Sequence, residues 1–120
     1  MKELPDPLAA HLVDPRCVGE VDPPRGRGRG TNEACGDLLE VWVGERAGRL
    51  TLRFRAQACA AVVAVASFAC ERLDGATRDE LEAFDLGREV DALGGLPRHR
   101  RHALRVFERA LAEALADLGP

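Results

Sequence analysis

The hydrophobic pattern changes near the middle of the chain from strict alternation to a continuous apolar run. Residues 39–43 and 50–57 alternate apolar with polar side chains, which predicts two strands with one face in the core and one in water. The connection 44–49 carries two glycines, so we expect an antiparallel hairpin. Residues 58–70 are apolar except for Ser67. That run is longer than a usual strand, so we expect a buried helix that ends near Gly75.

Capping signals predict further helices on both sides of this unit. A short helix is expected at residues 8–12, ended by Asp14-Pro15. Thr77-Arg78-Asp79-Glu80 is a capping-box pattern that opens another short helix. Asp85 to Leu93 forms a third, stopped by two glycines, and Pro97 suits the first residue of the last helix. The last helix carries an apolar stripe at three- and four-residue spacing, which we assign to the core: Leu104, Phe107, Leu111, Leu115 and Leu118.

A Gly/Arg/Pro-rich segment at about residues 22–33 precedes the hairpin. The run from Pro23 to Gly30 alternates glycine with arginine after two prolines. Such a composition is typical of a mobile loop, which is what we expect here. Its arginines could touch phosphate or an acidic partner, but the simpler interpretation is a solvated loop.

Length and charge narrow the classes of protein to which the chain can belong. Its 120 residues suit one domain spanning 1–120, and a net charge of −3 gives no case for nucleic-acid binding. No apolar stretch approaches the roughly 20 residues of a membrane span, and Met1–Ala10 lacks the apolar core of a signal peptide. We therefore expect no membrane partner and a cytoplasmic protein. Its four cysteines should be reduced thiols.

Three separate segments carry side chains that could form a metal site. Cys35 and Asp37 lie two residues apart and can point to the same side of an extended chain. Cys59 lies at a strand-to-helix junction, where the helix dipole favours thiolate, and His102 lies in the first turn or two of the last helix. Two thiols, a carboxylate and an imidazole suit zinc or iron. Taken singly, a small core residue, an exposed cap and a surface histidine are simpler interpretations of Cys59, Asp37 and His102.

The two other cysteines are weaker candidates. Cys70 lies 11 residues after Cys59 on the same expected helix, which separates them by roughly 16 Å along the axis. Ligands of one metal ion lie only about 4 Å apart, so we assign Cys70 to the core. Cys17 lies in a loop, and its role as a ligand stays open.

Five segments of the chain carry short motifs in a fixed order. His11–Gly19 is similar to H-x-x-N-P-R-N-x-G, Ala34–Asp37 matches A-C-G-D, and Phe54–Cys59 is similar to F-x-x-x-G-C. Ala66-Ser67 belongs to a small, serine-containing helix, and Leu96–Ala103 aligns with L-P-P-V-K-x-H-C. In this order the motifs resemble those of the NifU/IscU/SufU family of iron–sulfur cluster assembly scaffolds.

The resemblance implies an α+β fold with a small antiparallel β-sheet packed against several α-helices. It also implies a scaffold or carrier, not an enzyme, that holds iron, a [2Fe–2S] cluster or zinc through Cys35, Asp37, Cys59 and His102. A cysteine desulfurase would donate sulfur, and apo iron–sulfur proteins would accept the cluster.

Two departures from the family motifs leave alternatives open. Ala103 stands where the family has a third cysteine, the usual persulfide acceptor. We expect no dedicated Hsp70-type chaperone as a partner, because Leu96–Arg100 departs from L-P-P-V-K, the family segment that such a chaperone recognises. One alternative is a divergent homologue with a structural zinc site that acts as a binding or regulatory protein. Another is a thiol enzyme with Cys35 or Cys59 as nucleophile and His102 as base.

Overall fold

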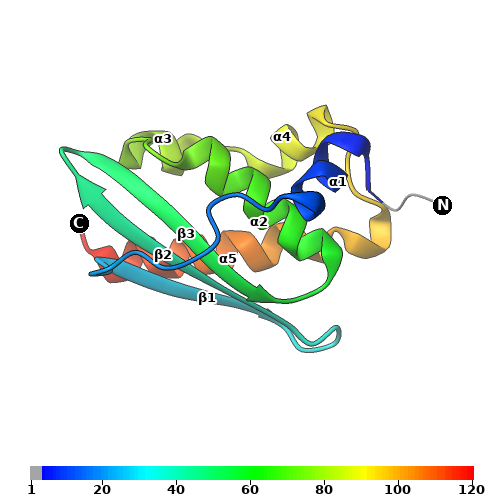
Figure 1. Ribbon diagram of the computed structural model, residues 1–120, viewed down its shortest axis with the longest axis horizontal. Coiled ribbons are helices and arrows are strands. Elements are labelled where there is room, and N and C mark those ends of the chain that lie inside the picture. The colour runs from blue at the N-terminus through cyan, green and yellow to red at the C-terminus, as the bar shows by residue number, and fades with distance from the viewer. Residues whose placement is uncertain (1–3) are drawn as a thin grey trace.

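The structure, a computed structural model, describes residues 4–120, so residues 1–3 of the expected domain and of the segment Met1–Ala10 lie outside the described residues. It is an α+β fold in which one three-stranded antiparallel sheet, in the order β1-β2-β3, packs against helices (Figure 1). This confirms the expected fold class. The elements are α1 (Asp6–Val13), β1 (Gly26–Asn32), β2 (Asp37–Arg46), β3 (Arg49–Gln57), α2 (Ala60–Leu73), α3 (Arg78–Ala83), α4 (Leu86–Ala92), a 3₁₀ turn (Arg98–Arg100) and α5 (His102–Leu118).

The expected hairpin is formed by β2 and β3. The two strands extend further than the alternation predicted, until Arg46 pairs with Arg49. Only Ala47 and Gly48 remain between them, and both have positive φ angles, 54° and 78°. Two left-handed residues are typical of the tight turn whose twist matches that of the flanking strands.

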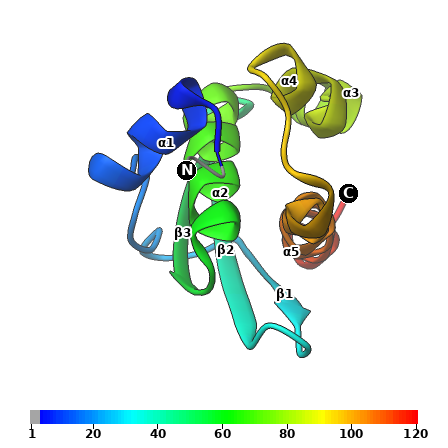
Figure 2. The ribbon, with the colours of Figure 1, turned by 90° about the vertical axis from the view of Figure 1, so that its right-hand side faces the viewer.

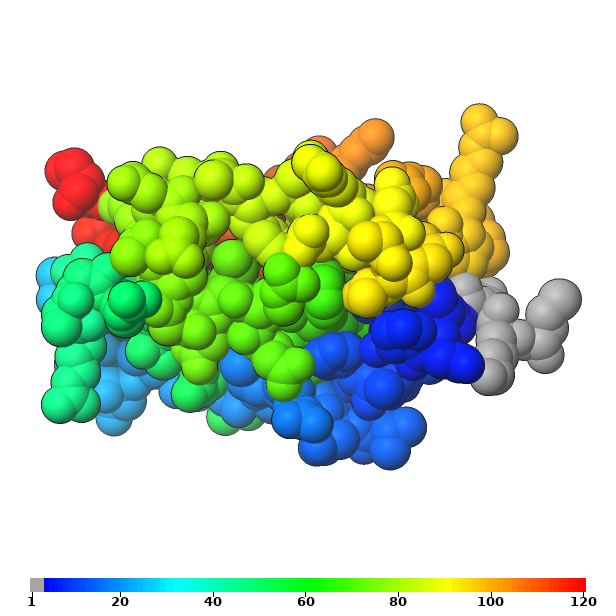
Figure 3. All heavy atoms as spheres, turned by 90° about the horizontal axis from the view of Figure 1, so that it is seen from above, coloured from blue at the N-terminus to red at the C-terminus, as the bar shows by residue number. Residues whose placement is uncertain are grey.

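Helices α2 and α5 cover the inner face of the sheet. Helix α2 lies between α1 and α5, and α5 runs along β1 and β2 (Figure 2). Because α2 has neighbours on several sides, nearly every residue from Ala61 to Cys70 is buried, as the continuous apolar run predicted. On the face shown in Figure 3, α2 lies between α3 and α4 on one side and α1 on the other. None of the helices among residues 4–120 is long and apolar enough to span a membrane.

The prediction of a loop at residues 22–33 is wrong for most of that segment, because Gly26–Asn32 forms the edge strand β1. Gly26, Gly28 and Gly30 face α5, and a Cβ built on each would overlap a main-chain carbonyl oxygen of that helix. The helix therefore lies directly on the strand backbone, at a distance that only glycine permits. Sequence periodicity missed this strand because its buried face has no side chains.

The outer face of the sheet is less exposed than the alternation predicted. Trp42, expected to face water, is 5% exposed. A segment of residues 18–25 crosses this face, from the Val18–Phe54 bridge beside β3 to the start of β1. Within it, Val21 lies against Gly44. The Arg27 guanidinium also lies over the indole, 5.5 Å from its centroid. A connection and an arginine thus replace solvent over the tryptophan.

The second half of the chain follows the capping signals closely. Thr77 and Glu80 form the expected capping box of α3, and the Asp85 side chain caps α4. Pro97 is not the first residue of α5, because a 3₁₀ turn intervenes and α5 begins at His102. That turn places His102 in the first turn of a long helix, at the end of the molecule that also carries the β1–β2 turn.

Candidate metal centre

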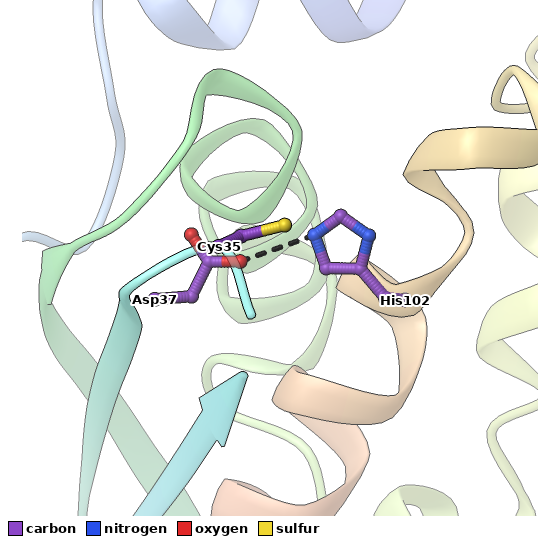
Figure 4. Close-up of side chains that lie close together, drawn as sticks. All are labelled: Cys35, Asp37 and His102. Atoms are coloured by element: carbon purple, nitrogen blue, oxygen red, sulfur yellow. Dashed lines mark hydrogen bonds and ion pairs between the residues drawn. The ribbon is translucent and has the colours of Figure 1, made fainter. Parts of the chain in front are cut away.

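Four side chains from three parts of the fold meet at one end of the sheet, and we call them the candidate centre: Cys35, Asp37, Cys59 and His102. Cys35 lies in the turn between β1 and β2, and Asp37 is the first residue of β2. Cys59 is the N-cap residue of α2, and His102 is the first residue of α5. Figure 4 shows the Cys35 sulfur and the Asp37 carboxylate directed toward the His102 imidazole.

Asp37 holds the centre together from its buried side. Its Oδ1 accepts a hydrogen bond from the Cys59 backbone N–H at 2.7 Å, so the carboxylate caps α2. Its Oδ2 lies 3.1 Å from His102 Nε2 and 3.9 Å from Cys59 Sγ. The residue is 3% exposed, and a buried carboxylate needs such partners to offset the loss of water. One oxygen is therefore used for structure, and the other faces the remaining ligands.

The donor atoms are spaced as ligands of one ion would be. Cys59 Sγ lies 3.7 Å from His102 Nε2, and donor atoms of Cys35, Asp37 and His102 lie within 4.8 Å of one another. Metal–sulfur and metal–nitrogen bonds of about 2.0–2.3 Å place tetrahedral ligands roughly 3.5–4 Å apart. Asp37 and His102 therefore lie at ligand spacing from each of the two thiols.

The direction of the imidazole argues against a nucleophile–base pair. In a thiol–imidazole–carboxylate relay, the thiol and the carboxylate contact different ring nitrogens. Here the Cys59 thiol and the Asp37 carboxylate both approach Nε2. Several donors converging on one point is the arrangement of a cation site, so Cys59, His102 and Asp37 do not form such a relay.

Exposure increases across the candidate centre. Asp37 is buried, Cys59 and His102 are half-buried, and Cys35 is exposed. The positive end of the α2 dipole at Cys59 favours negative charge on the thiolate and the carboxylate. The centre is thus anchored inside the fold and open on the side of Cys35.

The two remaining cysteines lie elsewhere. Cys70 is fully buried on α2, and burial raises the pKa of its thiol well above the usual value. Cys17 has a raised thiol pKa, first because of burial and then because of the charge of Asp74, which follows the C-terminal end of α2. The neighbouring Arg16 N–H binds the Ser67 hydroxyl, which places Cys17 beside the middle of α2, and Ser67 lies eight residues after Cys59, about 12 Å along the helix axis. Cys17 therefore does not replace the absent third thiol.

Ala103 is fully buried beside His102. Its methyl group has no donor atom, so position 103 contributes packing only.

One functional feature escaped the sequence analysis. Arg105 and Arg109 lie on the same side of α5 as His102 and line a groove beside it. The sequence contained a signal for this groove, because residues 102, 105 and 109 recur at helical spacing. We interpreted only the apolar positions of this helix.

The Ser67 hydroxyl links two segments that are far apart in the sequence, the N-terminal segment His11–Gly19 and helix α2. The Ser67 hydroxyl lies 2.6 Å from His11 Nδ1 and accepts the Arg16 backbone N–H at 2.7 Å. Ser67 is the single polar residue of the apolar run and is fully buried. It therefore fastens the N-terminal segment to α2.

Comparison with known proteins agrees with this fold and these motifs. Residues 6–119 match the family described as the NifU-like N terminal domain. The chain is 32% identical over 113 residues to the iron-sulfur cluster assembly scaffold protein IscU 1 of Archaeoglobus fulgidus, covering 93% of this chain and 74% of that protein. It is 36% identical over 110 residues to the bifunctional protein NifU/MnmA of Rubrobacter xylanophilus, covering 89% of this chain and 22% of that protein.

Solved structures give the same fold at lower identity. A NifU-like protein (N-terminal) from Brucella abortus superposes with a TM-score of 0.65 at 21% identity, over 93% of this chain and 91% of that one. A putative iron-sulfur cluster assembly scaffold protein for the SUF system from Fervidobacterium islandicum has a TM-score of 0.65 at 16% identity, over 92% and 93%. The match over nearly the whole chain places this protein in the NifU/IscU/SufU family.

Proposed function

We propose that this protein is an iron–sulfur cluster assembly scaffold or carrier whose cargo is held by Cys35, Asp37, Cys59 and His102. The observation that carries the proposal is the convergence of two thiols, an imidazole and a carboxylate oxygen from three elements around one point. The relatives named as scaffolds supply the reaction class. The partners are then a cysteine desulfurase and apo iron–sulfur acceptor proteins, in the cytoplasm.

The ligand set suits a cargo that must leave again. Two thiolates and an imidazole bind iron and zinc well, whereas a carboxylate is a harder and more exchangeable ligand for a cluster. Asp37 has one oxygen free for the cargo, because the other caps α2. A [2Fe–2S] cluster needs four protein ligands, two for each iron, and these four side chains supply that number.

Sulfur must arrive without a thiol at position 103. Cys35 is the exposed cysteine among residues 4–120, so it is the acceptor that a donor protein can reach. Its thiolate would attack the outer sulfur of the donor's persulfide, which forms the Cys35 persulfide and releases the donor thiolate. This transfer needs no additional oxidant or reductant.

Anaerobic reconstitution with ferrous iron and sulfide tests the proposal. We expect visible sulfur-to-iron charge-transfer absorption in the wild-type protein and its loss in Cys35→Ala. Cys17→Ala is the matched control, because this thiol lies beside the middle of α2, away from the candidate centre, and it should assemble as the wild type does. Equal absorption in Cys35→Ala and wild type would refute the assignment.

Metal analysis and transfer separate the proposal from a structural zinc protein. A scaffold should transfer its cluster to an apo-ferredoxin under anaerobic conditions. Stoichiometric zinc in the purified protein, with no cluster formed and no transfer, would favour the binding or regulatory role instead.

A further inference from the structure

A polar groove opens beside the candidate centre, between the β1–β2 turn and the first turns of α5. Its volume is about 450 Å³, and His102 lines it together with Thr31, Asn32, Arg105 and Arg109. Because His102 belongs to both, the groove and the centre are continuous. Figure 2 shows the β1–β2 turn and the start of α5 at the end of the molecule that faces the viewer.

The two arginines of the groove have no anionic partner among the described residues, 4–120. Arg105 and Arg109 are exposed and form no ion pair with any residue from 4 to 120. Arg101, one turn earlier, pairs instead with Asp91 at 3.3 Å. Glu33 is the one carboxylate among the residues that line the groove, at its turn side. The groove therefore has an excess of positive charge, whereas the whole chain has a net charge of −3.

The spacing of the two charges indicates what the groove can bind. Residues four apart on a helix have Cβ atoms about 5–6 Å apart, and each guanidinium can hold one carboxylate through two parallel hydrogen bonds. A cavity of this volume is in the range for small molecules. The acidic remainder of the surface repels a long polyanion such as a nucleic acid.

We propose that this groove binds a small polycarboxylate, a molecule with two or more carboxylates several ångströms apart. Its acidic groups pair with Arg105 and Arg109, and Thr31 and Asn32 offer further hydrogen bonds. The bound molecule lies next to His102 and covers one side of the candidate centre. The groove does not depend on a metal, so binding occurs in the metal-free chain.

The test is a titration of the full chain after its metal has been removed. Citrate is the polycarboxylate, acetate the single carboxylate and inorganic phosphate a compact anion, all at low ionic strength because salt weakens exposed pairs. In ¹⁵N-resolved spectra, citrate should shift the amide signals of residues 31–34 and 105–109. It should bind at least about tenfold more tightly than acetate, as expected when a second arginine–carboxylate pair adds to the first. Phosphate or acetate binding as tightly as citrate would overturn the proposal.

Matched variants locate the effect. Arg105→Gln and Arg109→Gln should each weaken citrate binding roughly fivefold, the value of one exposed ion pair, and Glu33→Gln should strengthen it. Arg46→Gln removes an exposed arginine at the far end of the hairpin and should change nothing. An equal loss in Arg46→Gln, or wild-type binding in both groove variants, would refute the site. Loss of cluster assembly with intact citrate binding would instead count against the scaffold function alone.

Discussion

The contact between β1 and α5 makes a quantitative prediction about Gly28. An alanine there would place its Cβ against the Ala110 carbonyl oxygen and the Ala114 amide nitrogen of α5. Overpacking costs about 1–3 kcal/mol when side chains can give way, and main-chain atoms cannot rotate aside, so the upper end applies. Removing a strand glycine regains about 0.5–1 kcal/mol. The free energy of unfolding should therefore fall by about 2 kcal/mol.

Urea denaturation and calorimetry measure this change. At roughly 4 °C per kcal/mol for a chain of this length, the Tm should fall by about 8 °C. Gly87→Ala is the matched control, because it is the same chemical change on α4, where the added Cβ meets only Asp85 Oδ1 at an ordinary 3.7 Å. That variant should stabilise the protein by up to about 0.5 kcal/mol. The close strand–helix contact is refuted if Gly28→Ala is as stable as Gly87→Ala.

Three further outcomes follow from particular contacts. Asp37→Asn keeps an oxygen for the Cys59 N–H but loses the negative charge of the carboxylate. The zinc affinity measured in a competition assay should therefore fall at least about tenfold, while the Tm changes by only a few degrees. An unchanged zinc affinity would remove Asp37 from the ligand set. Burial lowers the pKa of His11, so the unfolded state binds the proton more readily, and the free energy of unfolding should decline as the pH falls through and below 6.5. His11→Gln should make the urea midpoints at pH 7.5 and pH 5.5 more alike. A difference between the two midpoints as large as in the wild type would contradict this. Arg27→Ala uncovers Trp42, the single tryptophan, and should shift its fluorescence to longer wavelength. The free energy of unfolding should fall by about 1 kcal/mol. An unshifted spectrum would show that the guanidinium does not shield the ring.

Local patterns in the sequence predicted the elements whose cause is local. The β2–β3 hairpin, the buried α2 and the capped α3 each follow from periodicity or a cap within a few residues. Strand β1 could not be predicted in this way, because its buried face is glycine and the helix that buries it lies about 80 residues later in the chain. The same limit applies to Trp42, which a distant connection covers.

The candidate centre was predicted in composition but not in geometry. Family motifs singled out its four residues, and the structure brings them together. No sequence pattern could show that Asp37 divides its oxygens between the α2 N-terminus and the other ligands. The groove arginines were missed because only the apolar positions of the last helix were interpreted.

The uneven anchoring of the four ligands determines the order in which a cargo can exchange. Asp37, Cys59 and His102 are fixed by the ends of a strand and two helices, whereas Cys35 is carried by an exposed turn with Gly36 at φ 70°. Detaching a ligand on a turn disturbs the least structure, so it is the step with the lowest barrier. An incoming thiol from an acceptor protein would displace Cys35 first, with three bonds still intact. If the chain hands on a cluster as proposed, transfer would be a stepwise ligand substitution from the open side, with the cargo bound throughout.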